Sequence, residues 1–281
     1  MKYSVSSYSF SGLIKKGEMT QFDTIAKAKE MGFDGIELVD IAKHTDGDLL
    51  KYAESLRKEA EKQNIEVANV CLGADFINND FDAEVARVKE QVDAAAETGT
   101  KFLRHDVVYS LPAGKAFENI LPRIADACRE VTEYAAQKGI ITMVENHGFI
   151  CQDSDRVEKL FAAVNHPNFR LLTDMGNFLC ADENPVTAVS RVAPYAALVH
   201  AKDFIVKSGN EPDPGKGFFK SRGANYLRGT IIGHGNVPVK QCFNVLKKVG
   251  FDGWISLEFE GIEDVLFGIE TGFENLKKYA E

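Results

Sequence analysis

The chain alternates short apolar runs rich in β-forming residues with longer segments in which apolar residues recur every three to four positions, from its first residues to its last. The short runs predict buried strands, and the longer segments predict amphipathic helices. Eight runs of the first kind occur, at residues 3–10, 35–40, 66–73, 101–108, 141–147, 169–176, 196–204 and 254–260. The clearest helical segments are 20–32, 48–64, 84–99 and 116–139, and each closes on Gly or Asn, which favour helix C-termini.

Eight strand-and-helix units in a chain of 281 residues predict an α/β fold, a single (β/α)8 TIM barrel. A doubly wound open sheet uses the same alternation, but the count of eight favours the barrel. The length suits one barrel, so we expect a single domain over residues 1–281. One connection, about 205–236, is much longer than the others, Gly-rich and basic. Loops of this length tend to be lids or binding loops, and a solvated insertion is the alternative.

Charge and cysteine usage narrow the class of protein. The formal net charge is -9, which argues against a nucleic-acid groove because phosphate binding needs a basic face. The five cysteines are scattered and never form a C-x-x-C pair, so we expect reduced thiols. No run of about 18 uncharged apolar residues is present. We therefore expect a cytoplasmic protein with neither a nucleic-acid nor a membrane partner, and a homo-oligomer remains open.

Four strand ends carry polar groups. The fifth to eighth runs end in Glu145, Asp174, His200 and Glu258, each after two to four apolar residues. In a barrel the strand C-termini share one face, and residues two apart share one side of a strand, so these groups are predicted to converge inside the mouth. Burying three carboxylates together costs several kcal/mol per ion unless a cation is present. A single such residue is more simply an ion-pair partner, but four on consecutive strands predict a metal site.

The donor set indicates the metal. Three oxygen donors and one nitrogen without thiolate suit Mn²⁺ or Mg²⁺, while Zn²⁺ and Co²⁺ are not excluded. Glu260 shares the inward side with Glu258, and Glu258 is preferred because it follows the apolar residues directly. Asn146 has the opposite parity and is expected to serve the following loop.

The segments VENHG, LLTDMGN, LVHAKD and SLEFEG resemble the xylose isomerase-like TIM-barrel superfamily, in its sugar phosphate isomerase/epimerase branch, and the likeness extends over essentially the whole chain. The resemblance implies one divalent metal ion held by Glu145, Asp174, His200 and Glu258. It also implies that Glu145 and Glu258 form the acid/base pair. A DNA repair endonuclease branch with a histidine-rich zinc site is disfavoured, because this chain is acidic and has only six histidines.

A metal that chelates a hydroxy-ketone polarises the carbonyl and favours removal of the neighbouring proton to give an enediolate. Returning the proton to the other face is epimerisation, and returning it to the next carbon is isomerisation. We therefore expect an isomerase or epimerase acting on a sugar, sugar phosphate or related polyol ketone. The alternatives are a lyase or dehydratase on a keto-polyol or glycoside with the same metal site, and a non-catalytic sugar-binding accessory subunit. Phosphorylation of the substrate stays open: the basic residues of the long connection can bind a phosphate or be ordinary surface charge, and no Gly-rich phosphate motif supports the first alternative.

Four further residues lie at or just beyond strand ends and are candidates for substrate binding: His147, Asn177, Lys202 and His105. They can hydrogen-bond substrate hydroxyls or orient the ligand side chains. The alternatives are that Lys202 pairs with acidic neighbours and that His105 is a satisfied core histidine.

Overall fold

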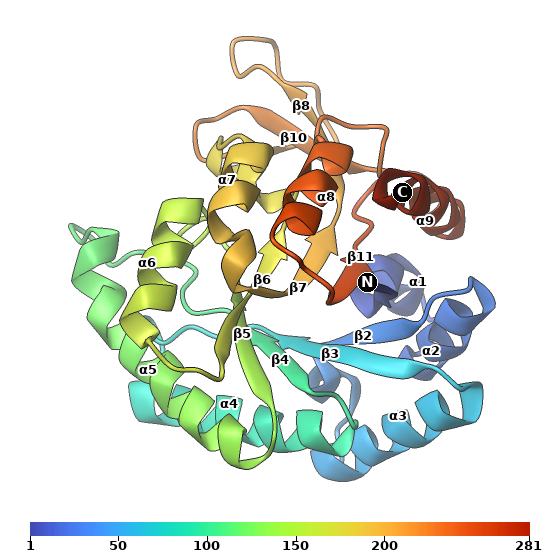
Figure 1. Cartoon of the computed structure of the whole chain (residues 1–281), viewed down its shortest axis with the longest axis vertical. Helices are drawn as coiled ribbons and strands as arrows, with labels where there is room; N and C mark the ends of the chain where they lie inside the picture. The colour runs from blue at the N-terminus through green and yellow to red at the C-terminus, as the bar shows by residue number, and fades with distance from the viewer.

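The computed structural model describes residues 1–281 and contains a closed barrel of parallel strands in the order β1-β11-β7-β6-β5-β4-β3-β2. Each of the eight predicted runs contains one barrel strand, so the predicted TIM barrel is confirmed (Figure 1). The barrel strands are β1 (Lys2–Ser6), β2 (Gly35–Val39), β3 (Glu66–Leu72), β4 (Phe102–His105), β5 (Ile141–Glu145), β6 (Phe169–Asp174), β7 (Ala196–Ala201) and β11 (Trp254–Leu257).

Helices surround the barrel. The four clearest predicted helices are α2 (Gln21–Glu30), α3 (Leu49–Gln63), α4 (Phe81–Glu97) and α5 (Phe117–Gln137). The others are α1 (Ser11–Lys15), α6 (Ser154–Val164), α7 (Pro185–Val192), α8 (Val239–Lys248) and α9 (Val265–Ala280), with 3-10 turns η1 (Ser7–Phe10), η2 (Ile41–His44), η3 (Asn177–Ala181) and η4 (Ala193–Tyr195). Helix α4 starts three residues before the predicted segment because the side chain of Asp80 caps its first turn. Asn64 and Gly139 follow α3 and α5 with positive φ, as expected for helix ends.

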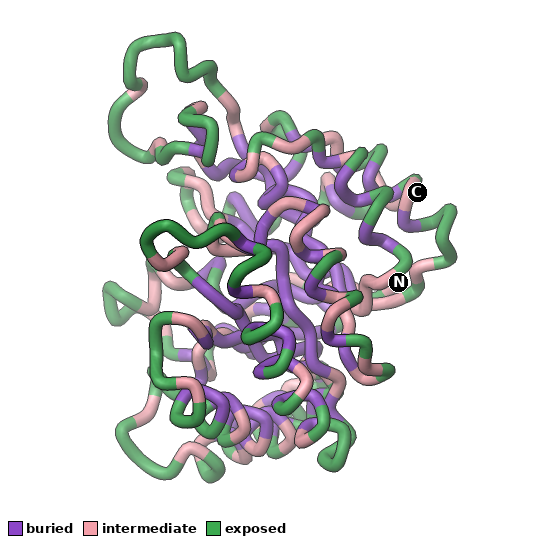
Figure 2. Tube along the Cα trace, turned by 90° about the vertical axis from the view of Figure 1, so that its left-hand side faces the viewer, coloured by how far each residue is buried: buried purple, intermediate pink, exposed green.

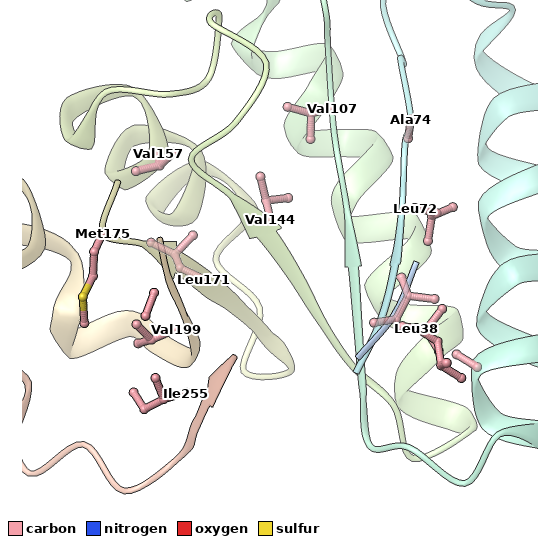
Figure 3. Close-up of a cluster of buried hydrophobic side chains, with 14 of the residues drawn as sticks. Leu38, Leu72, Ala74, Val107, Val144, Val157, Leu171, Met175, Val199 and Ile255 are labelled. Atoms are coloured by element: carbon pink, nitrogen blue, oxygen red, sulfur yellow. The ribbon is translucent and has the colours of Figure 1, made fainter. Parts of the chain in front are cut away.

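The side chains of the barrel strands divide into two buried layers. Val144, Leu171 and Val199 point outward and belong to the large cluster between barrel and helices, part of which Figure 3 shows. Inward-facing side chains fill the barrel interior in a second cluster, which comprises Ala68, Cys71, Met143, Leu172, Leu198 and Trp254. Met143, Leu172 and Leu198 each lie two positions before a candidate ligand. The strand parity read from the sequence is therefore confirmed for β5, β6 and β7.

The long connection 205–236 is more ordered than the sequence predicted. Strands β8 (Asp203–Lys207), β9 (Phe219–Lys220) and β10 (Tyr226–Thr230) form a small antiparallel sheet in the order β8-β10-β9. This segment projects from the barrel, and its outer part is largely exposed (Figures 1 and 2). The sequence did not predict these strands, because they are short and separated by Gly- and Pro-containing turns that obscure their pattern.

All five cysteines are free and buried. None of the helices combines the length and the apolar character needed to cross a membrane.

Candidate metal and active site

A cavity of about 240 Å³ opens at the C-terminal mouth of the barrel. Its lining includes Tyr8, Asp40, Lys43, Arg104, Asp106, Tyr109, Glu145, His147, His200, Lys202, Glu258 and Glu260. A larger hollow of about 670 Å³ lies around Trp254 at the N-terminal ends of the strands, where charged side chains such as Lys2 and Glu66 pair with each other. We place the chemistry at the smaller cavity, because buried titratable groups from several strands converge there.

The four predicted ligands meet at this mouth. Nδ1 of His200 lies 3.5 Å from Oε1 of Glu145, 3.7 Å from Oδ2 of Asp174 and 3.6 Å from Oε2 of Glu258. One donor atom from each residue lies within 4.8 Å of the others, so the group can hold a metal ion. Glu145 and Asp174 are the last residues of β5 and β6, His200 is in β7, and Glu258 directly follows β11. All four are buried.

One of the donor atoms supports a cation at this position. Nδ1 of His200 is buried and forms no hydrogen bond, whereas Oδ2 of Asp174 has the ammonium group of Lys202 at 3.0 Å. A buried nitrogen without a partner is costly, and a bound cation would remove that cost. The residues present therefore fit a divalent metal ion.

Backbone hydrogen bonds orient Asp174. Its Oδ1 atom accepts hydrogen bonds from the N–H groups of Gly176 and Asn177, at 2.7 and 2.8 Å, which leaves Oδ2 directed at the site. The side chain of Asn146 bonds to both the N–H and the carbonyl of Asp174. Asn146, expected to serve the loop, thus ties the end of β5 to the end of β6.

Glu145 is held by a buried arginine from β4. Nε of Arg104 lies 2.8 Å from Oε2 of Glu145, and the side-chain amide of Asn177 donates to Oε1 at 2.9 Å. Burial alone would raise the pKa of Glu145, but Arg104 and His200 outweigh burial and hold it well below its ordinary value. Arg104 also pairs with Asp106 at 2.7 Å. Glu145 is therefore an ionised carboxylate at neutral pH.

Glu258 has a different environment. Burial raises its pKa to about 7, although the ammonium group of Lys202 contacts the carboxylate and acts in the opposite direction. Nζ of Lys202 also lies 3.0 Å from Oδ2 of Asp174 and 2.9 Å from Oε1 of Glu260. Burial lowers the pKa of Lys202, but these carboxylates raise it well above its ordinary value. The two glutamates thus differ in proton affinity in the metal-free protein.

The four candidate substrate-binding residues separate into two pairs. His147 and Lys202 line the cavity, and Nδ1 of His147 is 2.9 Å from Oδ1 of Asp106. Asn177 is buried and contacts Glu145, as expected of a residue that orients a ligand side chain. His105 is fully buried, with Nδ1 2.8 Å from the carbonyl oxygen of Asp106 and its ring edge against Phe76. His105 does not line the cavity, so its place matches the core-histidine alternative.

Sequence reasoning missed several residues of the site: Glu37, Arg104, Asp106 and Tyr109. Glu37 in β2 is fully buried and contacts Nε2 of His200. The hydroxyl of Tyr109 donates to Oδ2 of Asp106 at 2.9 Å. The available signal was a charged residue within a predicted strand, Glu37 in GIELVD and Arg104 in KFLRHDVV.

Comparisons with known proteins agree with this fold. Among curated relatives, an inosose dehydratase from Clostridium botulinum is 26% identical over 142 residues, which are 49% of this chain and 46% of that enzyme. The chain thus spans about half the length of this relative in the alignment. The inosose dehydratase from Geobacillus thermodenitrificans is 23% identical over 257 residues, covering 87% of this chain and 83% of that enzyme.

Solved structures show the same fold at low identity. The probable 3-DHS dehydratase AsbF from Bacillus anthracis has a TM-score of 0.76 at 19% identity, covering 99% of both chains. The IOLI protein, solved with a zinc atom, has a TM-score of 0.77 at 16% identity, covering 100% of this chain and 98% of that one. D-allulose 3-epimerase from Methylomonas sp. has a TM-score of 0.75 at 17% identity, covering 99% and 98%.

The family model described as xylose isomerase-like TIM barrel matches residues 25–279. With the closed barrel and the polar mouth in place, this match confirms the resemblance read from the strand ends: the chain belongs to the xylose isomerase-like TIM-barrel family.

Proposed function

We propose that the protein is a divalent-metal-dependent enzyme that removes a proton from the carbon next to the carbonyl group of a sugar-like polyhydroxy ketone. The observation that carries this proposal is the buried set of Glu145, Asp174, His200 and Glu258, which brings four donor atoms together at one cavity. A bound metal ion would polarise the carbonyl and offset the negative charge that develops on its oxygen. Mn²⁺, Mg²⁺ and Zn²⁺ all suit this donor set.

The chain's own residues supply the proton transfers. Glu145 and Glu258 both line the cavity, and each approaches Nδ1 of His200 from a different strand. In the metal-free protein burial raises the pKa of Glu258 to about 7, whereas Arg104 keeps the pKa of Glu145 low. One carboxylate would take the proton from the substrate and the other group would return it. Lys202, which lines the cavity and contacts Glu258, is the candidate to bind a substrate oxygen.

Return of the proton to carbon makes the enzyme an isomerase or epimerase. The fold shared with D-allulose 3-epimerase supports this outcome. The cavity of about 240 Å³ also suits a substrate the size of a monosaccharide.

A dehydratase is at least as well supported. The curated relatives described above are inosose dehydratases, and AsbF is a probable dehydratase. In this reaction the same carboxylate removes the proton, the C–O bond to the neighbouring hydroxyl breaks, and a protonated group in the cavity supplies the proton with which hydroxide leaves as water. Lys202 and His147 line the cavity and are candidates for that donor.

An exchange experiment in D₂O tests the proposal and separates the two outcomes. Ketoses, ketose phosphates and inososes would be incubated with the metal-loaded protein, and NMR and mass spectrometry would follow deuterium uptake and water loss. Deuterium uptake without water loss would identify an isomerase or epimerase, and loss of water would identify a dehydratase. We expect a chelator to stop both and added Mn²⁺, Mg²⁺ or Zn²⁺ to restore them. Full turnover by metal-free protein would contradict the proposal.

Substitution of the two glutamates tests the proton transfers. We expect Glu145→Gln and Glu258→Gln each to lower kcat by about 10²-fold or more, because an amide cannot accept the substrate proton. Glu158→Gln is the matched control, since Glu158 pairs with Arg191 on the outer helices, far from the cavity. Steady-state kinetics and circular dichroism would be measured for all three. Turnover at the wild-type rate in either site variant would remove that glutamate from the reaction.

A further inference from the structure

The two ring nitrogens of His200 have separate partners. Nδ1 faces the three carboxylates of the candidate metal site, and Nε2 lies 2.9 Å from both oxygens of Glu37. Glu37 comes from β2, which does not neighbour β7 in the barrel, so this contact crosses the barrel interior. Both side chains are buried. A carboxylate only accepts hydrogen bonds, so the hydrogen between these groups belongs to Nε2.

Glu37 is itself held in position. The side-chain amide of Asn69, in β3, donates to Oε2 of Glu37 at 3.0 Å. Glu37 has no exposed surface, and a buried carboxylate without partners would cost several kcal/mol. Its contacts with His200 and Asn69 offset that cost. They also fix the direction of its oxygen atoms toward the imidazole ring.

We propose that Glu37 is a positioning residue for the metal site, which accepts the Nε2–H of His200 and thereby presents the Nδ1 lone pair to an ion held with Glu145, Asp174 and Glu258. This inference rests on the metal site in the proposed function. A ligating histidine generally donates its other N–H to a carboxylate or carbonyl, which fixes its tautomer and orientation and raises its basicity as a ligand. Here the carboxylate is supplied from another strand across the barrel.

The geometry argues against a second metal ion at Glu37. Glu37, Cys71 and His200 also bring donor atoms within 4.8 Å of one another. However, the amide nitrogen of Asn69 lies 3.0 Å from Glu37 Oε2 and 3.1 Å from the sulfur of Cys71. The side-chain amide of Asn69 thus donates to both of these candidate ligand atoms. The cluster is therefore joined by hydrogen bonds.

Calorimetric titration of chelator-treated full-length protein with Mn²⁺ and with Zn²⁺ tests the role of Glu37. We expect Glu37→Gln to bind each ion about 10- to 100-fold more weakly than the wild type. Glu183→Gln is the control, because Glu183 accepts two hydrogen bonds from Ser154 away from the cavity, so its loss should change stability without changing metal affinity. Thermal unfolding of each metal-free variant separates stability from affinity.

NMR of zinc-loaded protein labelled with ¹⁵N-histidine gives a readout that a purely structural role would not change. In the wild type we expect His200 to carry its proton on Nε2, with a downfield shift from the bond to Glu37. In Glu37→Gln we expect that signal to lose its downfield shift. If Glu37→Gln does not fold, Asn69→Ala keeps Glu37 but removes the hydrogen bond that orients it, and we expect affinity to fall several-fold.

The outcomes separate this inference from the proposed function. If the wild type binds no divalent ion, the proposed metal site fails. If the wild type binds one ion and Glu37→Gln has the same affinity and the same Nε2–H signal, the positioning role fails while the metal site stands. Two ions per wild-type chain, one of them lost in Glu37→Gln, would make Glu37 a metal ligand and overturn the inference.

Discussion

Burial shifts the pKa of two histidines of this barrel in the same direction, and the groups around each ring decide whether its pKa ends above or below the ordinary value. Desolvation lowers the pKa of both His105 and His200. His200 is surrounded by Glu37, Glu145 and Glu258, which raise its pKa well above the ordinary value. His105 lies against Phe76 and a backbone carbonyl, and its pKa falls to about 4. The surrounding carboxylates therefore favour the cationic form of His200 in the metal-free protein, whereas burial favours the neutral form of His105.

The neutral His105 predicts a pH dependence of stability. Because its pKa is lower in the folded state than in the unfolded state, the unfolded chain binds the extra proton between about pH 6.5 and pH 4. The contribution of neutral His105 to the free energy of unfolding is complete above about pH 6.5 and is lost as the pH falls. Between pH 7.5 and pH 5 the wild type should lose about 2 kcal/mol of unfolding free energy through this residue.

In His105→Gln, the free energy of unfolding should fall by about 2 kcal/mol less than in the wild type between pH 7.5 and pH 5. Urea unfolding of the metal-free proteins at the two pH values measures this difference. His234→Gln, a change at an exposed histidine, should retain the wild-type dependence. An equal loss in the wild type and in His105→Gln would show that His105 is not held neutral by the fold.

The residues at strand ends could be predicted from the sequence, and those inside strands could not. Glu145, Asp174, His200 and Glu258 stand where four apolar runs end, and parallel strands bring such positions to one face. Glu37 and Arg104 lie within runs, where a single charge is equally compatible with an exposed position. Their partners, His200 and Glu145, come from strands that are distant in sequence. Closure of the barrel brings Glu37 to His200, whereas Arg104 and Glu145 meet on the neighbouring strands β4 and β5.

At the scale of elements, the eight barrel strands were predictable because each has a continuous apolar pattern, whereas the sheet formed by β8, β9 and β10 was not. Asp203, the first residue of β8, anchors this addition. Its carboxylate accepts hydrogen bonds from the N–H groups of Phe204, Gly233, Gly235 and Val237, at 2.8–2.9 Å. This contact joins the start of the projecting sheet to the segment that returns from β10 to α8.

Gly235 is a sensitive position in that return segment. A Cβ atom there would lie 2.2 Å from Oδ1 of Asp203 and 2.5 Å from the carbonyl oxygen of Phe204, which is backbone and cannot move away alone. We expect Gly235→Ala to lower the free energy of unfolding by about 1–3 kcal/mol, as overpacking does. Faster amide hydrogen exchange in β8 and β10 should accompany this loss.

Gly47→Ala is the control for Gly235→Ala, because the nearest atom to its added Cβ would be 3.5 Å away. Its stability should stay close to that of the wild type. If Gly235→Ala kept the wild-type free energy of unfolding and the wild-type amide hydrogen exchange in β8 and β10, the hydrogen bonds of Asp203 would accommodate the added Cβ atom without loss of stability.

At the scale of the whole molecule, the fold concentrates acidic groups at one buried point. The formal net charge of -9 describes the chain, but the four residues at the mouth come from four consecutive strands of the closed barrel, β5, β6, β7 and the end of β11. The unfolded chain separates these residues, so it cannot offer the same four ligands to one ion. An ion that binds only the folded state stabilises it by mass action. Metal binding and barrel stability are therefore expected to be coupled.

This coupling predicts a metal-dependent melting temperature. At an ion concentration about 100 times Kd, the wild type should gain about 2.7 kcal/mol of stability, which corresponds to several degrees in Tm. Asp174→Asn should lose most of this gain. If the amide nitrogen takes the place of Oδ2, the ion loses a ligand oxygen. If the nitrogen takes the place of Oδ1, the N–H groups of Gly176 and Asn177 lose their acceptor. Asp155→Asn removes the same charge from the outer helix α6 and should keep the full gain. Differential scanning fluorimetry with Mn²⁺, Mg²⁺ and Zn²⁺ measures all three proteins. Equal shifts in the wild type and in Asp174→Asn would mean that the ions act on the acidic surface and not at the barrel mouth.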